Sequence, residues 1–558
     1  MTMKSMTKHV STRKTPQSQP IPGSKQVANS AGGYSYEASP WTRLTRFLIL
    51  GSEGGTYYIG EQKLTVDNAK NVISCIKADG PKVVQTIVDV SLEGRAYKND
   101  PAIFALALCC AHGDEATRKA AYASITKVCR IGTHLFHFAQ ALQDLHGKWS
   151  RGLRKGVSAF YENRKPESLA GQLVKYRQRD GWTHRDVMRL AHPSVEGQAN
   201  AMLRWAVDKE VPSELLAGTL IEAFQEVQKL KNTKEDIKTA VRLIKEHQLM
   251  REALPTELLK EVPVWEALLD NMPITAMIRN LGNMTANGLL KSALTDSVKH
   301  VVKTLSSDTI LREGRVHPMA VLLALKTYEQ GHGEKGNKSW TPVRAIVDAL
   351  NESFYKAFAS VESTGQNWLL ALDVSGSMGS TSVPNSPLTC REAAAAMALV
   401  TARVEPYHEI IGFTNSGTNA FGKGGKSKWS SMHGLGTGVS QLGISPKMSL
   451  NEVVKKTSNL EFGGTDCALP MLYAAHNDLK VDTFVIYTDN ETWAGDIHPT
   501  QALKAYRKEF NPNAKLVVVS MEANEFSIAD PDDSGMLDVV GFDASAPRVI
   551  SDFSKGLV

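Results

Sequence analysis

The chain has 558 residues, of which 42% are hydrophobic, 22% charged and 7% aromatic. This is ordinary globular composition, and it excludes a mainly disordered, collagen-like or coiled-coil protein. The net charge of +6 divides into +4 over residues 1–40, +9 over residues 41–360 and −7 over residues 361–558. We therefore expect the first two-thirds of the chain to attract polyanions and the last third to attract cations.

The first 40 residues are rich in Ser, Thr, Pro, Gly, Lys and Gln and have no apolar periodicity. This composition predicts a disordered basic arm over residues 1–40. No apolar stretch follows Lys4 and Lys8, so the segment does not resemble a secretory signal peptide. The whole sequence also lacks the run of about 18 apolar residues that a membrane-spanning helix needs.

Residues 41–360 carry a repeated pattern of amphipathic helices. Apolar residues recur at i, i+3, i+4 and i+7, and the clearest helices are predicted over residues 101–112, 112–129, 212–230 and 233–247. Thr233 and Asp236 have capping-box spacing at the start of the last of these helices. Helix pairs joined by short loops over some 320 residues predict an α-solenoid of the HEAT type.

The hydrophobic pattern of the sequence changes after residue 360. Continuous apolar runs predict buried parallel strands in NWLLALD, HEIIGFT, DTFVIYTD and KLVVVSM, and helices are predicted in CREAAAAMALVTARV and DCALPMLYAAHNDL. Strands that alternate with helices indicate a doubly wound α/β sheet over residues 361–558, which binds ligands at the carboxyl ends of its strands.

Six cysteines are scattered through the chain, and none forms a C-x-x-C pair. This number is far too small for a disulfide scaffold, and Cys109 and Cys110 lie in an apolar run where thiols act as small hydrophobes. The sequence therefore predicts a reduced protein of the cytoplasm.

Five oxygen-bearing side chains follow the predicted strands of the last third. Asp373, Ser375 and Ser377 form a D-x-S-x-S motif after the first strand. Thr465 lies in GGTD before a helix, and Asp489 ends the strand DTFVIYTD. Two carboxylates and three hydroxyls form a hard, oxygen-only ligand set that suits Mg²⁺ rather than zinc. Alternatively, DVSGSM is only a turn that caps a helix.

This pattern resembles the metal-ion-dependent adhesion site of von Willebrand factor A domains. The resemblance implies that the D-x-S-x-S residues are the first-loop ligands of a divalent metal ion. It further implies that Thr465 is the second-loop ligand and Asp489 the third-loop ligand. Water, a partner carboxylate or a phosphate would complete the coordination shell.

The densest positive charge lies in residues 151–190, which carry a net charge of +6. Aromatic and imidazole side chains, including Tyr176, Trp182 and His184, interrupt the Lys and Arg residues of this segment. Cations of this kind release counterions from phosphates, and ring planes stack on unpaired bases. The alternative is a solvated helix face with aromatic residues in the core.

Four segments closely resemble the Ro autoantigen family, also called TROVE proteins. They are FLILGSEGGTYYIGEQKL at 47–64, VCRIGTHLFHFAQ at 128–140, KYRQRDGWTHRDVMRLAHP at 175–193 and GRVHPMAVLLALKTYEQGHG at 314–333. Together with DVSGSM and GGTD, the resemblance runs from about residue 41 to the C-terminus. It implies a ring of HEAT-like helical repeats over residues 41–360, closed by a von Willebrand factor A-like domain over residues 361–558.

The resemblance also implies what the protein binds. Family members hold small structured Y RNAs on a basic outer surface and single-stranded 3′ ends of misfolded RNA in a central hole. Lys175, Arg179 and His192 match the positions of the family's Y RNA contacts. No role is assigned to His317, for which a core or capping position is favoured over RNA contact. The arm over residues 1–40 either adds non-specific RNA affinity or has no role.

Three functions therefore compete. The first is a non-catalytic, monomeric RNA-binding protein that acts in non-coding RNA quality control and the stress response. The second is a metal-dependent adhesion module that recruits a partner such as a nuclease. The third is a metal-assisted nuclease, which is disfavoured because the predicted site offers no evident general base and no second metal cluster. The sequence also lacks a P-loop motif, so ATP-driven work is not expected.

Overall fold

The computed structural model describes residues 14–51, 69–333, 338–358, 361–383, 388–414, 438–458 and 464–557. It contains two compact units. One comprises Ile73–Ala357 and is called the helical unit; the other comprises Met1–Val72 and Phe358–Val558 and is called the α/β unit. Among the described residues, no helix combines the length and apolar character that crossing a membrane requires.

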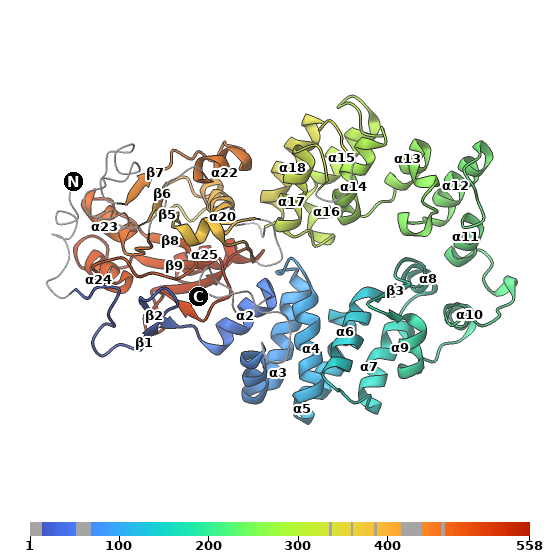
Figure 1. Cartoon of the computed structure of the whole chain (residues 1–558), viewed down its shortest axis with the longest axis horizontal. Coiled ribbons are helices and arrows are strands. Elements are labelled where there is room, and N and C mark those ends of the chain that lie inside the picture. The colour runs from blue at the N-terminus through green and yellow to red at the C-terminus, as the bar shows by residue number, and fades with distance from the viewer. Residues whose placement is uncertain are drawn as a thin grey trace. The chain divides into compact units, whose positions relative to one another are not determined.

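The helical unit consists of consecutive helices, each packed against a helix close to it in the chain. Its elements are α3 (Lys70–Glu93), α4 (Asp100–His112), α5 (Glu115–Val128), α6 (Gly132–Asp144), α7 (Arg151–Glu162), α8 (Pro166–Lys175), β3 (Gln178–Arg179), β4 (Trp182–Thr183), α9 (His184–Ala191), α10 (Gly197–Ala206), η2 (Ser213–Leu215), α11 (Leu220–Val227), α12 (Lys234–His247), η3 (Arg251–Ala253), η4 (Leu258–Lys260), α13 (Val262–Leu269), α14 (Ile274–Ala286), α15 (Asp296–Leu305), α16 (Asp308–Glu313), α17 (Pro318–Glu329) and α18 (Arg344–Lys356). Packing between near neighbours is typical of an α-solenoid, and Figure 1 shows the helices following one another along a curved path.

The two ends of this helical array contact each other. The ring of His317, just before α17, forms a hydrogen bond of 3.0 Å with the carbonyl oxygen of Arg95, which precedes α4. The same imidazole lies 5.9 Å from the ring of Tyr97, centroid to centroid. The helical unit therefore closes on itself, which agrees with the predicted ring of HEAT-like repeats.

The predicted helices are confirmed with one exception. Thr233 and Asp236 form the expected capping box at the start of α12. The helix predicted over residues 212–230 is wrong as a single element, because it is divided into the short η2 and the later α11. Gly218 has a left-handed φ of +72°, and Thr219 caps α11, so the chain turns between the two segments.

The α/β unit contains a six-stranded sheet with the order β11-β9-β8-β5-β6-β7. All of its strands are parallel except β7, which pairs antiparallel with β6. Its elements are β5 (Trp368–Asp373), α19 (Gly376–Ser380), α20 (Cys390–Val404), β6 (His408–Phe413), β7 (Val439–Gln441), α22 (Leu450–Ser458), α23 (Leu469–His476), β8 (Thr483–Thr488), α24 (Pro499–Glu509), β9 (Lys515–Ser520), β10 (Phe526–Ser527), β11 (Met536–Val540) and α25 (Ala546–Lys555). The predicted doubly wound α/β fold is confirmed.

Both faces of this sheet are buried, which explains the continuous apolar runs of its strands. Every residue of β5 and β8 is buried. Alternate residues such as Leu369 and Phe484 pack in one cluster with α23 and α24. On the opposite face, the hydroxyl of Tyr487 lies 3.4 Å from that of Thr401 on α20.

The disordered arm predicted over residues 1–40 requires correction. Described residues from Lys14 onward belong to the α/β unit and form β1 (Gln26–Ala28) and β2 (Tyr34–Glu37), followed by α2 (Pro40–Leu50). β2 pairs with both β1 and β10, so a segment with weak local signals is ordered by long-range pairing. Residues 1–13 lie outside the described part, as do residues 52–64 of the motif at 47–64.

Candidate functional site

The five predicted metal-binding residues lie at the carboxyl edge of the sheet. Asp373 ends β5, and Asp489 directly follows β8, its parallel neighbour. Ser375 and Ser377 lie at the start of α19, and Thr465 precedes α23. All five residues are buried, with at most 5% of the surface of each exposed. The loops that follow the strands therefore place the predicted ligands inside the α/β unit.

Hydrogen bonds hold the first loop in place. The Asp373 carboxylate accepts from the backbone N–H of Ser375 at 2.9 Å and from the hydroxyl of Thr488 at 2.7 Å. The hydroxyls of Ser375 and Ser377 are 3.1 Å apart. The guanidinium of Arg391 donates to the carbonyl oxygen of Ser375 at 2.8 Å. The D-x-S-x-S motif thus forms a hydrogen-bonded loop between β5 and α19.

The electrostatics of this loop cluster favour a cation. Burial, reinforced by the charge of Asp489, raises the pKa of Asp373. Burial also raises the pKa of Asp489, and a hydrogen bond from Ser377 opposes this shift. Within the described residues, Oδ2 of Asp489 is buried with no hydrogen-bond partner. An orphaned carboxylate oxygen of Asp489, near the Asp373 carboxylate and the Ser377 hydroxyl, fits a hard divalent cation such as Mg²⁺.

Further buried carboxylates surround the same loops. Burial and then the charge of Asp489 raise the pKa of Glu491 to about 7 and that of Glu522 to about 9. Both side chains have one carboxylate oxygen without a hydrogen-bond partner in the described part of the chain. Acidic side chains are therefore concentrated at this edge of the sheet, and their burial favours the protonated form when no cation is present.

The N-terminal segment braces the second and third loops of this cluster. Gln17 is fully buried, and its amide donates to Asp466 Oδ1 at 2.7 Å and to the carbonyl oxygen of Ile497 at 2.8 Å. Its amide oxygen accepts a hydrogen bond from the hydroxyl of Thr492. The sequence analysis missed Gln17, because a single polar residue in a polar segment carries no local signal.

The sequence analysis also missed two residues that form hydrogen bonds with the D-x-S-x-S loop, Thr488 and Arg391. Thr488 is the last residue of β8, and its hydroxyl contacts Asp373 across neighbouring strands. Arg391 lies on α20 and reaches the first loop over Gly379, where a Cβ atom would lie only 2.7 Å from the guanidinium. Gly379 in the sequence GSMG is a signal that another group approaches closely, but it does not identify Arg391 as that group.

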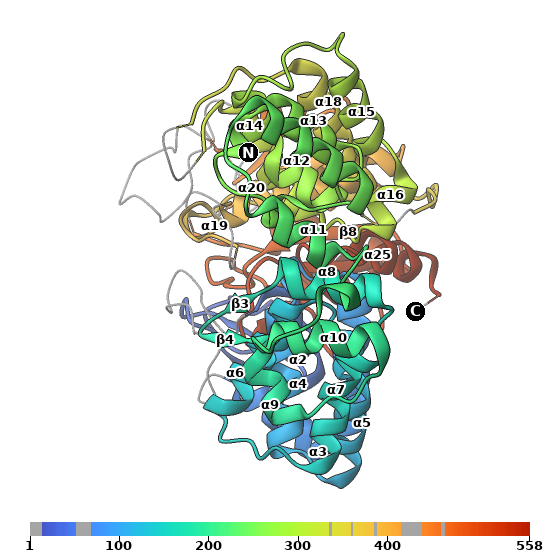
Figure 2. The same cartoon turned by 90° about the vertical axis from the view of Figure 1, so that its right-hand side faces the viewer.

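The three predicted RNA contacts lie on one continuous segment of the helical unit. Lys175 ends α8, Arg179 lies in β3, and His192 caps the C-terminus of α9. Arg179 and His192 are exposed, whereas Lys175 is partly buried with its ammonium 5.4 Å from the ring centroid of Tyr176. The hairpin of β3 and β4 packs on α6 (Figure 2). Neither a hydrogen bond nor an ion pair joins any two of these three described residues.

Among the rings of this segment, His184 belongs to the core, whereas Tyr176 and Trp182 are partly buried. His184 is buried, lies 3.0 Å from the Tyr161 hydroxyl through Nδ1, and packs edge-on against Phe136. Burial lowers the pKa of His184 to about 4. The indole N–H of Trp182 donates to Gln140 Oε1 at 2.9 Å. For His184, the core alternative is therefore correct.

His317 has the capping position that the sequence analysis favoured. It is the N-cap of α17, and its Nδ1 accepts a hydrogen bond of 3.1 Å from the backbone N–H of Met319. Its other ring nitrogen contacts the carbonyl oxygen of Arg95. Both nitrogens thus have partners within the helical unit.

Two models of known protein families together match most of the chain. The family model of the TROVE domain matches residues 27–250 and 241–327, and that of the Ro60 vWA domain matches residues 367–554. The chain belongs to the Ro60 family of TROVE-domain proteins. The first match begins at residue 27, inside the segment predicted to be a disordered arm, in agreement with the ordered β1 and β2.

Individual proteins that are similar to this chain support its place in the Ro60 family. The RNA-binding protein RO60 of Deinococcus radiodurans is 40% identical over 559 residues and covers 100% of both chains. The RNA-binding protein RO60 of Caenorhabditis elegans is 37% identical over 614 residues, covering 96% of this chain and 90% of that protein. The crystal structure of the Deinococcus radiodurans RO (RSR) protein is similar at a TM-score of 0.67, covering 93% of this chain and all of the other.

Proposed function

We propose that this protein binds RNA without catalysing a reaction, and that it acts in non-coding RNA quality control and the stress response. The observation that carries the proposal is its 40% identity, over the full length, to a relative named an RNA-binding protein. The closed array of helices and the exposed cations of the 175–192 segment are consistent with this function.

Two kinds of RNA would use different parts of the helical unit. Small structured RNA of the Y type binds the basic surface that includes Lys175, Arg179 and His192. The single-stranded 3′ end of a misfolded RNA enters the hole that the ring of repeats encloses. Selection then depends more on shape than on base sequence, because cationic side chains contact the phosphate backbone and a hole admits only a flexible strand.

The α/β unit supplies a second activity in this proposal. The loop residues around Asp373 and Asp489 hold Mg²⁺, and the metal ion binds a carboxylate of a partner protein such as a nuclease. The observation that favours this activity is the buried Asp489 oxygen that has no partner among the described residues. The protein is a monomer of the cytoplasm in this proposal; its six cysteines, all buried free thiols, are in keeping with the reducing conditions of that compartment.

The test compares a structured RNA that has a single-stranded 3′ tail with the same RNA made blunt, over a series of salt concentrations. The variant is Lys175→Ala, Arg179→Ala and His192→Ala combined. The matched control is Lys299→Ala, His300→Ala and Arg312→Ala, which removes the same side-chain types from exposed positions elsewhere in the helical unit.

Wild type is expected to prefer the tailed RNA. The variant should lose affinity for both RNAs, and its plot of log K against log salt should be shallower by roughly 1.4 to 1.8, because two fixed cations are removed. The control should retain wild-type behaviour. If wild type binds neither RNA above non-specific affinity, the RNA function is wrong and the adhesion module becomes the better account. Loss of partner capture in Asp373→Ala, with RNA binding intact, would support the adhesion activity.

A further inference from the structure

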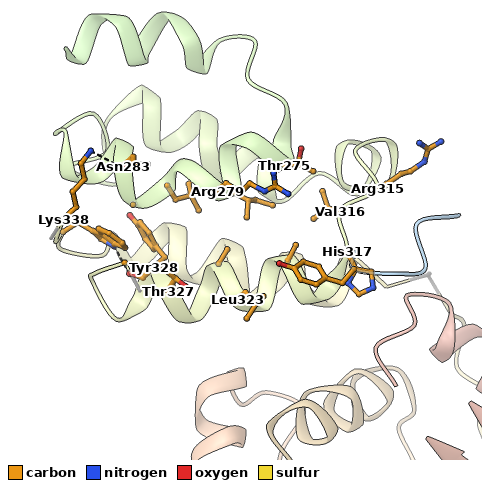
Figure 3. A pocket seen from close by; sticks show the side chains of 18 residues that line it. Thr275, Arg279, Asn283, Arg315, Val316, His317, Leu323, Thr327, Tyr328 and Lys338 are labelled. Atoms are coloured by element: carbon orange, nitrogen blue, oxygen red, sulfur yellow. Dashed lines mark hydrogen bonds between the residues drawn. The ribbon is translucent and has the colours of Figure 1, made fainter. Parts of the chain in front are cut away.

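The helical unit contains a cavity of about 740 Å³ between α14 and α17, called here the α14–α17 cavity. Figure 3 shows the two helices lying along its opposite sides. Its apolar lining comes from Ile278 and Leu281 on α14 and from Ala320, Leu323 and Ala324 on α17. This volume and an apolar lining with a few polar groups are typical of a site for a small organic ligand.

Aromatic rings line both ends of the α14–α17 cavity. At one end, the partly buried Trp340 stacks on Tyr328 with ring centroids 6.1 Å apart and planes inclined by 23°. Its indole N–H donates to the Tyr328 carbonyl oxygen at 2.9 Å, and a Cβ atom on Gly282 would lie 2.6 Å from the ring. The indole is thus fixed against α14 before any ligand arrives. At the other end, Tyr97 packs beside His317.

The charged residues that line the cavity are all cationic. They are Arg279, Arg315 and Lys338, and no Asp or Glu is found among the described lining residues. Arg279 lies between the two helices, with Lys338 at one end of the cavity and Arg315 at the other (Figure 3). The ammonium of Lys338 donates to Asn283 Oδ1 at 3.2 Å. Within the described chain, neither arginine forms an ion pair. The described lining of the cavity therefore favours an anionic ligand over a cationic one.

A second arginine near Arg315 strengthens the preference for an anion. Arg130 follows α5, and its guanidinium donates to the hydroxyl of Ser91 at 2.7 Å. Burial, and after it the charge of Arg315, lowers the pKa of Arg130. Arg130 and Arg315, which are far apart in the chain, thus repel each other beside the cavity. The surroundings of the cavity are therefore positively charged and attract anions.

We propose that the α14–α17 cavity binds one unpaired nucleotide of RNA. The base lies on the apolar lining beside Trp340, and Arg279 binds the phosphate. Proteins bind unpaired nucleotides without reading their sequence by two interactions. The base stacks on an aromatic side chain, and a cationic side chain makes a charge-assisted contact with the phosphate. This inference rests on the proposed RNA-binding function and adds the place where a single-stranded residue is held. A free nucleotide has the same chemistry.

The test measures binding of a six-nucleotide single-stranded RNA, of UMP and of AMP to the full-length protein. Arg279→Ala removes the central cation from an exposed position, whereas Ala324→Trp fills the cavity and leaves every charge in place. Arg312→Ala is the matched control, because Arg312 is exposed and does not line the cavity. Thermal unfolding of each variant verifies that the helical unit is intact.

We expect both cavity variants to bind the oligonucleotide about tenfold more weakly than wild type, equal to roughly 1.4 kcal/mol. Arg279→Ala should also make the salt dependence shallower by about 0.7, which is the contribution of one phosphate of a single strand. The control should match wild type. Competition by UMP or AMP at millimolar concentration would identify free nucleotides as a second source of the ligand, and its absence would restrict the ligand to RNA.

Cross-linking keeps the proposal testable if Ala324→Trp fails to fold. A hexanucleotide with one 4-thiouridine, irradiated with wild-type protein, should attach to Trp340 or Tyr97 in peptides identified by mass spectrometry. Cross-links confined to other segments, or variants that bind like wild type, would overturn the cavity assignment while leaving RNA binding intact. If wild type binds no RNA, the proposed function is wrong, and the binding of UMP and AMP then tests the cavity separately. Loss of nucleotide binding in Ala324→Trp would support the cavity as a nucleotide site. Unchanged or absent nucleotide binding would overturn it.

Discussion

Replacing Gln17 tests whether the N-terminal segment is an integral part of the α/β unit. The Gln17 side chain is fully buried and takes part in three hydrogen bonds, to Asp466, Thr492 and Ile497. Gln17→Ala removes all three bonds and leaves the Asp466 carboxyl group with one donor among the described residues, the backbone N–H of Ala468 at 3.1 Å. A disordered arm would show no effect of this change.

The magnitude follows from these contacts. A neutral hydrogen bond contributes about 1 kcal/mol, and one to a charged group about 1.5–3 kcal/mol. Two neutral bonds and the bond to Asp466 therefore predict that Gln17→Ala lowers the free energy of unfolding of the α/β unit by roughly 3 to 5 kcal/mol. Gln17→Glu, which preserves the shape but places a second carboxylate beside Asp466, should destabilise the unit at least as much.

The assay is native-state hydrogen exchange read by mass spectrometry on the full-length protein. This readout resolves peptides of β8 and α23 separately from those of the helical unit, where a single unfolding curve would merge two transitions. Gln19→Ala is the matched control, because Gln19 is the same residue type two positions along the chain and its side chain is exposed. The control should change the exchange free energy by less than about 0.5 kcal/mol.

Two results would refute the reasoning. One is a Gln17→Ala protein whose exchange in β8 and α23 matches wild type. The other is a Gln17→Glu protein as stable as wild type at pH 9, above the pKa of about 7 to which burial raises Asp466, because two facing carboxylates then have to cost free energy if the contact is real.

Three further predictions concern other positions. Because the pKa of His184 is lowered to about 4 against an unfolded value of 6.5, the unfolded state binds more protons and stability falls as pH drops from 6.5 to 4. The loss is roughly 3 kcal/mol, and His184→Gln should reduce it in unfolding measured across this pH range. Saturating Mg²⁺, at 100 times its Kd, should stabilise wild type by about 2.7 kcal/mol; an equal rise in Tm for Asp373→Asn would contradict the metal site. Gly282→Leu should displace Trp340, seen as altered tryptophan fluorescence together with weaker oligonucleotide binding.

Much of the fold could be predicted because its signals are local. The strand WLLALD of β5 is buried on both faces, so its residues form an unbroken apolar run that is visible in the sequence. The capping box at Thr233 is equally local, since its two side chains are three residues apart. The grouping of the candidate metal ligands Asp373 and Asp489 was predictable for a related reason: parallel strands bring their carboxyl ends to one edge, so residues that follow separate strands come together.

The parts that escaped prediction depend on contacts between distant segments. The order of β1 and β2 comes from pairing with β10, and neither segment has a strong strand pattern of its own. Gln17 meets Asp466 across 449 positions of the chain. His184 illustrates the opposite difficulty, because only its burial against Tyr161 distinguishes a core imidazole from one that contacts a ligand.

The pairing of β2 with β10 also has a consequence for how the protein is made. Glu37 pairs with Phe526, so about 490 residues of chain separate two neighbouring strands. At a synthesis rate of about 5–20 residues per second, the N-terminal strand waits roughly 25 to 100 s on the ribosome before its partner is translated. The whole helical unit emerges in that interval. The α/β unit is therefore the last part of the molecule to be completed, and a chain released early leaves an unpaired strand edge exposed to aggregation.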